Sequence, residues 1–531
     1  MLLSRTSPAL QSRRGVVLIA VLIVVALLTL AAYQYSELMT AEYRATASYT
    51  RAAQARAFAE SGINYAAMLL SDPDLFANRL NGNPFDNPDI FRDQAVGDDR
   101  DGGRRGYFSV IAPYGPDDPS GDNTTFLYGA TDEAGKINLN GLLKADSSGT
   151  LAVQILTNLG IPEDTANAIL DWIDADDTPR ANGAESDYYS TMNPPYRPRN
   201  GPLQTLEELL FVRGVTPDLL FGNDLNRNGV LDPEEGTGDR DLGWAAYLTV
   251  YSREQNVDST GAPRTYINDA NTTNLNQTLG QILPTDVVNY ILIYRRYGPN
   301  SSPPSGQASQ GMGGSAPMPM GGMAQQMPIK NAADLSQDSL GLSTNARGRR
   351  IASLFELVNS EVLIPANGPQ QPATRIPSPL NDQQKLKETL PILLDKLTTT
   401  RDQDLPARVN VNTAPRAVLL ALPGLTQSDV DTITQTRPQP GSNTGADPTY
   451  NTPAWLLTQA NLDVNKLKTL EKFITARTQV YRIQVKGYFP GGGPSVRLEA
   501  VIDTNRGRPR VVYWRDLSEL GPGFNIPPVG N

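Results

Sequence analysis

The chain has 531 residues, and its 46 lysines and arginines against 56 aspartates and glutamates give a formal net charge of −10. It contains no cysteine and no histidine, which excludes disulfides, thiolate zinc sites, Ser-His-Asp triads and histidine-bound metals. Most conventional enzyme classes are therefore disfavoured. Any bound metal is expected to be a hard cation held by oxygen atoms, and broad binding to nucleic acid phosphates is not expected.

The amino-terminal region predicts one membrane helix behind a short basic leader. Residues 1–15 contain three arginines and no acid, and residues 16–32 are apolar except for Thr29. This run is just long enough to cross a bilayer, and the arginines before it place the N-terminus in the cytoplasm and the remainder outside. Residues 32–70 contain no proline and a single glycine, so one continuous helix is expected over residues 16–70.

The start of this helix resembles a type IV prepilin leader. The junction reads Arg13-Arg14-Gly15-Val16, and the resemblance implies that an inner-membrane prepilin peptidase cuts between Gly15 and Val16. Pilins usually carry glutamate at the fifth mature position, which is Ala20 here. In lacking this glutamate, the chain resembles one family, general secretion pathway protein K, a minor pseudopilin of type II secretion. An ordinary signal anchor is the alternative.

The middle of the chain contains a repeated phrase with asparagine. Residues 136–140, 266–272 and 408–413 each read as a short strand carrying asparagine, and the last two segments align without a gap. This self-similarity suggests duplicated units, in which the asparagine side chains cap the next helix. Apolar spacing predicts three helical segments, of which the first two resemble helix–hairpin–helix units: 151–173, 414–437 and 203–219.

A cluster of acids lies in residues 163–187, where eight acids face a single cation, Arg180. Parts of 171–189, and residues 200–209, resemble protein K. That family is understood to bind calcium in its helical domain. The resemblance implies that some of four acids are calcium ligands: Asp174, Asp176, Glu185 and Asp187. A solvated acidic loop is the alternative, and glycoside hydrolysis is disfavoured because nothing else resembles a sugar-binding cleft.

Residues 224–235 match the spacing of a calcium-binding loop of the EF-hand type. Gly229 stands at the sharp turn, and no exit helix is expected because Gly236 follows at once. Alternate oxygens converge on the ion in such a loop, and a bidentate glutamate closes the shell. The expected ligands are Asp224, Asn226, Asn228, the carbonyl of Val230, Asp232 and Glu235. An acidic loop of Asx turns is the alternative.

Residues 298–328 have low complexity. These 31 residues contain 7 glycines, 6 prolines, 5 serines and 5 methionines, and no charge. They lack the side chains of a core, so a flexible linker is expected over 298–347, with a sticky methionine patch as the alternative.

The unit at 414–437 is expected to pack against protein, not against DNA. Helix–hairpin–helix units often bind DNA through the backbone of a Gly-hydrophobic-Gly hairpin backed by cations. Here the hairpin reads Gly424-Leu425-Thr426, which lacks the second glycine, and the next helix offers Asp429 and Asp431. No nucleic acid partner is therefore expected.

Strand-like segments occur at 106–114, 480–489, 496–504 and 510–516, and the last three read as an antiparallel meander. Packed on the long helix, they predict an α+β, type IV pilin-like fold with a large, mainly α-helical insertion that contains the helix–hairpin–helix-like units. In having such an insertion within a pilin-like fold, the chain resembles the protein K family. Residues 243–254 and 266–268 are expected to add a small strand pair within it.

The predicted organisation has seven parts. They are a leader (1–15), the transmembrane and pilin helix (16–70), the first part of the pilin-like domain (71–130), the first part of the insertion with the calcium loops (131–297), a linker (298–347), the second part of the insertion (348–470) and the C-terminal strands (471–531).

The resemblance implies a minor pseudopilin at the tip of the type II secretion pseudopilus, without enzymatic activity. Its expected partners are the I and J minor pseudopilins, the prepilin peptidase and the bacterial inner membrane, contacted through residues 16–32. The bulk of the chain is expected in the periplasm. The alternatives are a minor pilin of a type IV pilus or DNA-uptake system whose helix–hairpin–helix units touch DNA, and a membrane-anchored, calcium-dependent binding protein.

Overall fold

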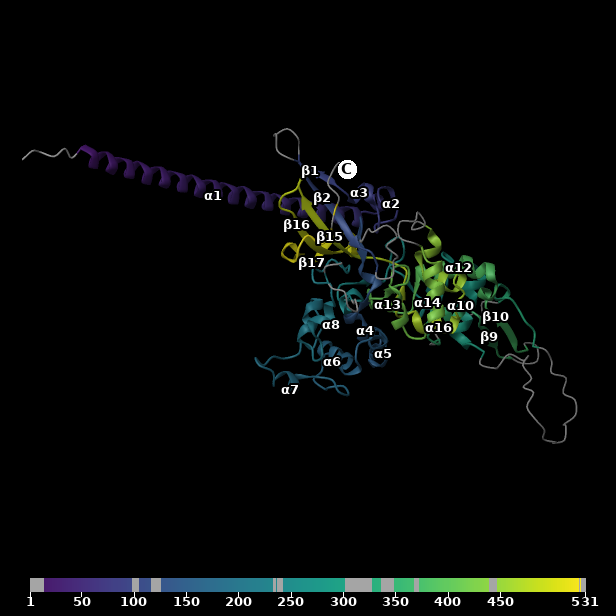
Figure 1. Ribbon diagram of the computed structural model, residues 1–531. Coiled ribbons are helices and arrows are strands. Elements are labelled where there is room, and N and C mark those ends of the chain that lie inside the picture. Colours follow the sequence, from purple (N-terminus) through teal and green to yellow (C-terminus); the bar gives the residue numbers. More distant parts are fainter. Residues whose placement is uncertain are drawn as a thin grey trace, which may run out of the picture.

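The computed structural model describes residues 14–97, 105–115, 126–232, 235, 242–300, 327–335, 348–366, 372–438, 447–524 and 526. A long helix leads into a body built on an antiparallel sheet, and a mainly helical lobe lies beyond the sheet (Figure 1). The predicted α+β fold class is confirmed. Residues 1–13 of the predicted leader and most of the predicted linker lie outside the described residues.

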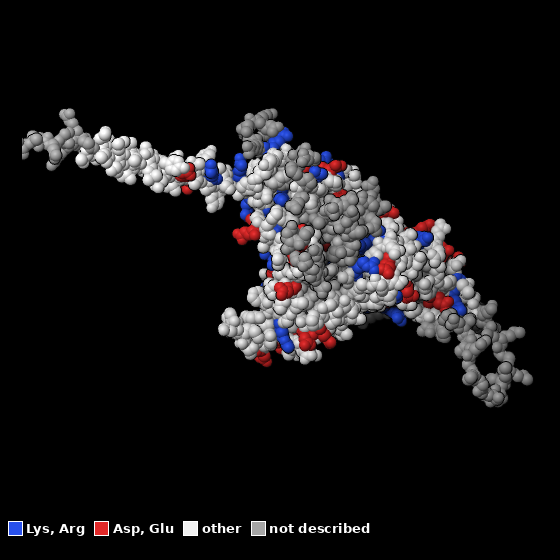
Figure 2. Space-filling view, in the orientation of Figure 1, with Lys and Arg blue, Asp and Glu red and all other residues white. Residues whose placement is uncertain are grey.

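Helix α1 spans Arg14–Ser71, which is about 87 Å at 1.5 Å per residue. Residues 16–36 of α1 carry no charged side chain, and the apolar residues among them are exposed (Figure 2). Among the described residues, α1 is the one helix long and apolar enough to cross a membrane. It ends where Asp72 caps the short helix α2 (Pro73–Asn78) by accepting hydrogen bonds from two backbone N–H groups.

The main sheet has the strand order β1-β2-β15-β16-β17, with β3 added to β2 and β4 added to β15. All these pairings are antiparallel, so the predicted meander over β15, β16 and β17 is confirmed. Its strands are β1 (Gln94–Val96), β2 (Gly106–Pro113), β3 (Phe126–Leu127), β4 (Thr131–Asp132), β15 (Val480–Tyr488), β16 (Val496–Asp503) and β17 (Arg510–Asp516), and helix α3 (Pro88–Phe91) precedes β1. We call this sheet, together with α1 to α3, the pilin-like body.

The last third of α1 packs on β2, β15 and β16 through small residues. Ala55 and Ala59 are fully buried. A β-carbon on Gly62 would lie 2.5 Å from Cγ1 of Val485, and one on Gly487 would lie 2.1 Å from the carbonyl oxygen of Ala55. Gly62, the glycine at this contact, is therefore explained by the close approach of strand β15.

The chain leaves the sheet after β4 and returns at β15, and residues 133–479 between them form the insertion. The insertion has a hydrophobic core of its own, distinct from the core under α1. Its helices are α4 (Leu139–Ala145), α5 (Thr150–Asn158), α6 (Glu163–Ile173), α7 (Ser186–Tyr189), α8 (Pro217–Phe221), α9 (Thr272–Gly280), α10 (Thr285–Tyr297), α12 (Gln383–Lys396), α13 (Arg416–Ala421), α14 (Gln427–Thr436), α15 (Trp455–Thr458) and α16 (Val464–Leu470).

Three two-stranded parallel pairs repeat along the insertion. Each first strand belongs to one of the predicted asparagine phrases, and each second strand ends in threonine. The pairs are β5 (Ile137–Asn138) with β6 (Leu248–Thr249), β8 (Thr265–Tyr266) with β11 (Leu397–Thr398), and β13 (Val409–Asn410) with β14 (Ile474–Thr475). The expected pairing of 243–254 with 266–268 is therefore wrong, because each of these segments pairs within its own repeat.

Two antiparallel pairs are the remaining named strand pairs in the described part of the insertion. They are β7 (Glu254–Gln255) with β12 (Asp404–Leu405), and β9 (Glu361–Ile364) with β10 (Thr374–Pro377). The helical stretch expected over 203–219 is interrupted. It consists of a 3₁₀ helix at Leu206–Phe211 and the short helix α8, because Gly214 takes a φ of 84° between them and Thr216 caps α8.

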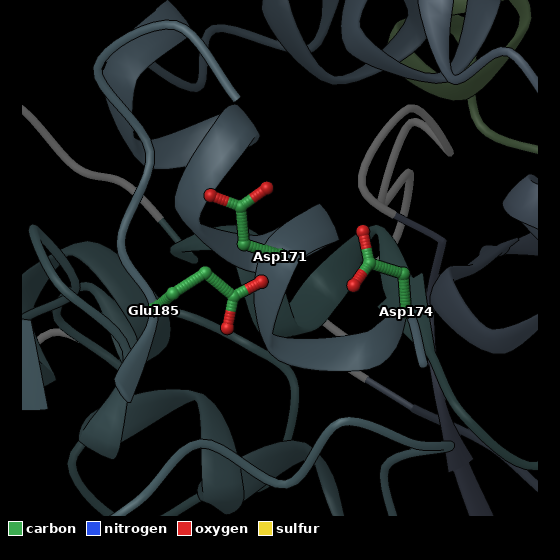
Figure 3. A group of neighbouring side chains, drawn as sticks. All are labelled: Asp171, Asp174 and Glu185. Carbon is green, nitrogen blue, oxygen red and sulfur yellow. The ribbon is translucent and has the colours of Figure 1, made fainter. Parts of the chain in front are cut away.

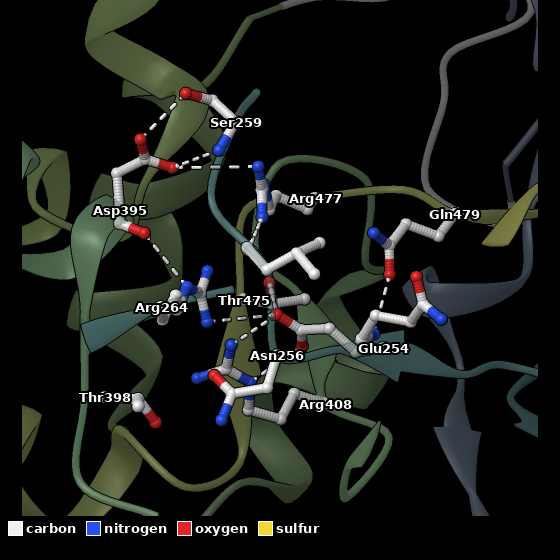
Figure 4. Close-up of polar contacts among 12 residues, drawn as sticks. Glu254, Asn256, Ser259, Arg264, Asp395, Thr398, Arg408, Thr475, Arg477 and Gln479 are labelled. Carbon is white, nitrogen blue, oxygen red and sulfur yellow. Dashed lines mark hydrogen bonds and ion pairs between the residues drawn. The ribbon is translucent and has the colours of Figure 1, made fainter. Parts of the chain in front are cut away.

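The buried carboxylate of Glu254 and several half-buried charges join the repeats (Figure 4). The Glu254 carboxylate accepts hydrogen bonds from Arg408 and from the hydroxyl of Thr475, at 2.8 and 3.3 Å. Arg477 donates to the carbonyl of Val257 at 2.6 Å and pairs with Asp395 at 3.6 Å. Buried ion pairs of this kind hold geometry because removal of either partner strands the other charge.

Candidate metal centre

Three carboxylates converge where α6 ends. Asp171 lies in α6, Asp174 follows its last residue, and Glu185 precedes α7 (Figure 3). One oxygen atom of each side chain lies within 4.8 Å of the other two. Asp171 is 0% exposed and Glu185 is 3% exposed. Among the residues that the structure describes, this is the group of three acids whose geometry suits a metal ion.

A tight turn wraps around Asp171 and fixes its carboxylate. The backbone N–H groups of Ala184 and Arg180 donate to it at 2.9 and 3.2 Å. A β-carbon on Gly183 would lie 1.8 Å from Oδ2 of Asp171, so only glycine fits there. The turn therefore brings Glu185, 14 residues later in the chain, back to the end of α6.

Arg180 supplies the only positive charge among the described contacts of the group. Its Nη1 atom donates to Asp171 at 2.8 Å and also pairs with Asp174. Three carboxylates against one guanidinium leave the group with two negative charges in excess. Burial of unbalanced charge is costly unless the carboxylates bind protons or a further cation.

Glu185 carries the clearest sign of an unmet charge. Both of its carboxylate oxygens, and Oδ1 of Asp174, are buried without a hydrogen-bond partner. Burial, followed by the negative charges of Asp171 and Asp174, raises the pKa of Glu185 to about 8. The unpaired oxygens of Asp174 and Glu185, beside the hydrogen-bonded carboxylate of Asp171, form the donor set that a hard cation such as calcium prefers, so these residues fit the ion expected from the sequence.

The structure brings together two of the four acids named from the sequence in 163–187. Asp174 and Glu185 belong to the group, whereas Asp176 and Asp187 are exposed and lie outside it. Asp171 was not among the expected ligands. Its signal was the spacing of Asp171 and Asp174, because residues three apart share one face of a helix.

The loop expected at 224–235 closes on itself. Asp224 accepts hydrogen bonds from the backbone of Asn228 and Gly229 at 3.0 and 2.9 Å, and Gly229 makes the turn with a φ of 83°. Glu235 accepts from the backbone N–H groups of Asn226 and Asp232, each at 3.0 Å. Asp224 is therefore bonded to the middle of the loop, and Glu235 joins its last position to Asn226 near its start.

The remaining predicted ligands complete this loop. The side-chain amides of Asn226 and Asn228 donate to Oδ2 of Asp232 at 2.7 and 2.9 Å, and the N–H of Val230 donates to Asn228 at 2.8 Å. Burial, opposed by backbone hydrogen bonds, raises the pKa of Asp224 to about 6. Internal hydrogen bonds satisfy these side chains, in contrast to the unpaired oxygens of Glu185.

The loop also docks on the body. The carbonyl of Arg227 accepts from Nε2 of Gln484 in β15 at 3.0 Å, and Asn228 donates to the carbonyl of Gly523 at 2.7 Å. The carbonyl of Asn226 accepts from Arg497 in β16. The loop is thus one of the places where the insertion is fastened to the sheet.

Comparison with known proteins points to one family. Residues 135–221, which contain the group of three acids, match the family model of type II secretion system (T2SS) protein K. A type II secretion system protein K from Pectobacterium carotovorum subsp. carotovorum is 45% identical over 69 residues, which are 12% of this chain and 21% of that protein. A putative type II secretion system protein K from Escherichia coli K12 is 30% identical over 110 residues, 18% of this chain and 34% of that protein.

These alignments span about a fifth and a third of the two relatives. A chain in the crystal structure of the GspK–GspI–GspJ complex, from the type 2 secretion system of enterotoxigenic Escherichia coli, is 11% identical. That match covers 90% of this chain and 99% of the other, with a TM-score of 0.37. The family resemblance read from the sequence is confirmed by the match of residues 135–221.

Proposed function

We propose that this chain, which carries a type II secretion system protein K domain, is a minor pseudopilin at the tip of the type II secretion pseudopilus. In that position it takes part in protein secretion across the outer membrane. The match of residues 135–221 to protein K carries the proposal. The placement of this domain in a lobe between β4 and β15 of a pilin-like body supports it.

Residues 16–32 anchor the chain in the bacterial inner membrane. The basic leader keeps the N-terminus in the cytoplasm, and the body and insertion lie in the periplasm. Prepilin peptidase cuts between Gly15 and Val16, which lie in the first turn of α1. The apolar, uncharged run of α1 from Val16 onward supports this anchoring (Figure 2).

The chain occupies the tip and contacts the I and J minor pseudopilins. Ala20 supports a tip position, because a carboxylate at this depth in the bilayer is costly unless the next subunit neutralises it. The insertion supports it as well. A lobe of this size beside the sheet would clash with neighbours along a closely packed filament (Figure 1).

The role is mechanical and recognitional, without catalysis and without a nucleic acid partner. In the α13–α14 unit, Asp431 pairs with Arg416 and Lys466 donates to Asp429 at 2.5 Å. These ion pairs occupy cations that a phosphate backbone would need. They favour secretion over the DNA-contacting pilin that the sequence left as the alternative.

The function is tested by deleting the gene in its own bacterium and complementing it with the full chain. Secreted proteins are expected to accumulate in the periplasm of the deletion strain and to return to the medium on complementation. The full chain is expected to co-purify with the I and J pseudopilins. Loss of DNA uptake or pilus-dependent motility with intact secretion would favour the minor-pilin alternative and overturn the proposal.

We further propose that calcium is the cofactor of this chain. Asp171, Asp174 and Glu185 hold one ion at the end of α6, and the loop residues hold another: Asp224, Asn226, Asn228, Val230, Asp232 and Glu235. Bound calcium supplies the positive charge that the acids of each site lack. The buried, unpaired oxygens of Glu185 support the first site, and the ligand spacing of an EF-hand loop supports the second.

Calcium is tested by thermal unfolding of the full chain in detergent, with calcium or with chelator. Calcium at about 100 times its Kd is expected to stabilise the protein by about 2.7 kcal/mol for each site. Glu185→Gln and Glu235→Gln are each expected to lose the calcium stabilisation that belongs to one of the two sites. Asp187→Asn is the matched control for Glu185→Gln, because it removes an exposed acid two residues away, in α7. A variant that keeps the full calcium effect removes its site from the proposal.

A further inference from the structure

We infer that Arg180 sets the calcium affinity of the Asp171–Asp174–Glu185 centre by acting as a tethered cation that competes with the ion. The inference rests on the proposed calcium binding. It concerns a residue that is not a ligand, and it predicts that the centre has two alternative counter-ions. One is the guanidinium of this chain, and the other is free calcium.

The contacts of Arg180 place it in the electrostatic position that a bound cation would take. Its guanidinium bridges Asp171 and Asp174, and its side chain is 24% exposed, so a path to solvent exists. It has no bond to Glu185, whose two oxygens remain unpaired. One internal cation therefore satisfies part of a site built from three acids.

The centre keeps its shape when the guanidinium leaves. Asp171 remains held by the backbone N–H groups of Arg180 and Ala184, which do not depend on the arginine side chain. Gly183 closes the turn against the same carboxylate. Replacement of the guanidinium by calcium breaks the two ion pairs of Arg180 and frees oxygen atoms of Asp171 and Asp174. The turn that presents Glu185 stays in place.

Two electrostatic effects of removing the guanidinium act in the same direction. Without it, a divalent ion meets three negative charges with no nearby positive charge to repel it. The metal-free state also loses its only partner for Asp171 and Asp174 among the described cations, so the acids repel one another there. Both effects favour calcium, and at an effective dielectric constant near 20 they amount to at least about tenfold in Kd.

Arg213 offers a matched control, because it contacts the same turn from the segment before α8. It donates to the carbonyl of Gly183 at 3.1 Å and stacks over the ring of Tyr188. No ion pair joins it to a carboxylate among the described residues. Arg213→Gln therefore removes an equal charge from the turn without removing a partner of the acids.

The experiment titrates calcium chloride into the full-length chain in detergent by calorimetry. The chain carries Glu235→Gln, which removes the proposed loop site. Arg180→Gln is expected to lower the Kd at least about tenfold, whereas Arg180→Lys, which keeps the charge, and Arg213→Gln are expected to stay within about threefold of the parent. Without calcium, Arg180→Gln is expected to unfold at a lower temperature than the parent, and calcium is expected to remove that difference.

The outcomes separate the two proposals. An unchanged Kd in Arg180→Gln overturns the inference. A higher Kd also overturns it, because Arg180 would then position the acids for calcium and not compete with the ion. If neither the parent nor Arg180→Gln binds calcium, the proposal that this centre holds calcium falls. Binding by Arg180→Gln alone supports the inference, since the guanidinium then excludes the ion in the parent. If Arg180→Gln does not fold without calcium, Arg180→Lys decides, because a tenfold change in its Kd would contradict a role for charge.

Discussion

Asp132 connects segments of the chain that are far apart in sequence. It is 4% exposed, and it accepts hydrogen bonds from the hydroxyls of Thr413 and Thr478 at 2.7 Å each and from the amide of Asn410 at 2.8 Å. The backbone of Ala134 adds a fourth bond at 2.7 Å. Burial nevertheless raises the pKa of Asp132 from 3.8 to about 6. This carboxylate therefore fastens the insertion to the body, and its charge opposes its burial.

At low pH, Asp132→Ala is expected to destabilise the protein by about 3 kcal/mol, because three side-chain donors lose a buried partner. The folded state binds the Asp132 proton more tightly than the unfolded chain does. The contribution of Asp132 to the unfolding free energy is therefore largest below pH 4 and falls by roughly 3 kcal/mol as the pH rises through 6. The loss should be larger at pH 4.5 than at pH 7.5.

Denaturant unfolding followed by circular dichroism at these two pH values measures this dependence. Glu388→Ala is the control, because Glu388 is an exposed acid on α12. An equal loss from Asp132→Ala at both pH values would contradict the raised pKa.

Among the elements, the crossing of α1 over β15 depends on the absence of side chains. Gly62 on the helix and Gly487 on the strand face backbone or core atoms at distances that no β-carbon tolerates. Fully buried alanines on α1 continue the same contact. The helix can therefore lie directly on the strand, and the core of the body forms around this contact.

Gly487→Ala is expected to destabilise the protein by about 1–3 kcal/mol, because its β-carbon would lie 2.1 Å from a backbone oxygen that cannot move without shifting α1. Thermal unfolding of the full chain measures the effect. Gly280→Ala is the control, since nothing lies within 4 Å of its β-carbon, and it should leave stability unchanged or raise it by up to about 1 kcal/mol. Equal stability of the two variants would contradict this packing.

The regular elements were predictable because their signals are local. The run of apolar residues and the absence of proline predicted α1, and alternating apolar residues predicted β2, β15, β16 and β17. The parallel pairs were not predictable in their pairing. Each pair has two residues per strand, and β5 and its partner β6 lie about a hundred residues apart in the sequence. Apolar spacing over 203–219 did not predict the break at Gly214, because a left-handed φ depends on the surrounding packing.

At the scale of the whole molecule, the sequence predicted a pilin module split by a helical insertion, and the structure has that α+β arrangement. The candidate site was predictable in part. The acid cluster was visible in the sequence, but its convergence depends on the turn around Asp171, and the choice of Glu185 over its acidic neighbours depends on burial. Neither is a property of residue spacing alone.

The insertion also determines when the body can fold during synthesis. Strand β2 ends at Pro113, and its partner β15 begins only at Val480. At about 5–20 residues per second, the ribosome needs roughly 20–70 s to make the intervening chain. Throughout that interval α1 and β2 lack strands β15 and β16, which complete the sheet and the core under α1. A newly made chain therefore passes through a prolonged state in which its first core is open, and protection of that surface by chaperones or by the membrane becomes part of its biogenesis.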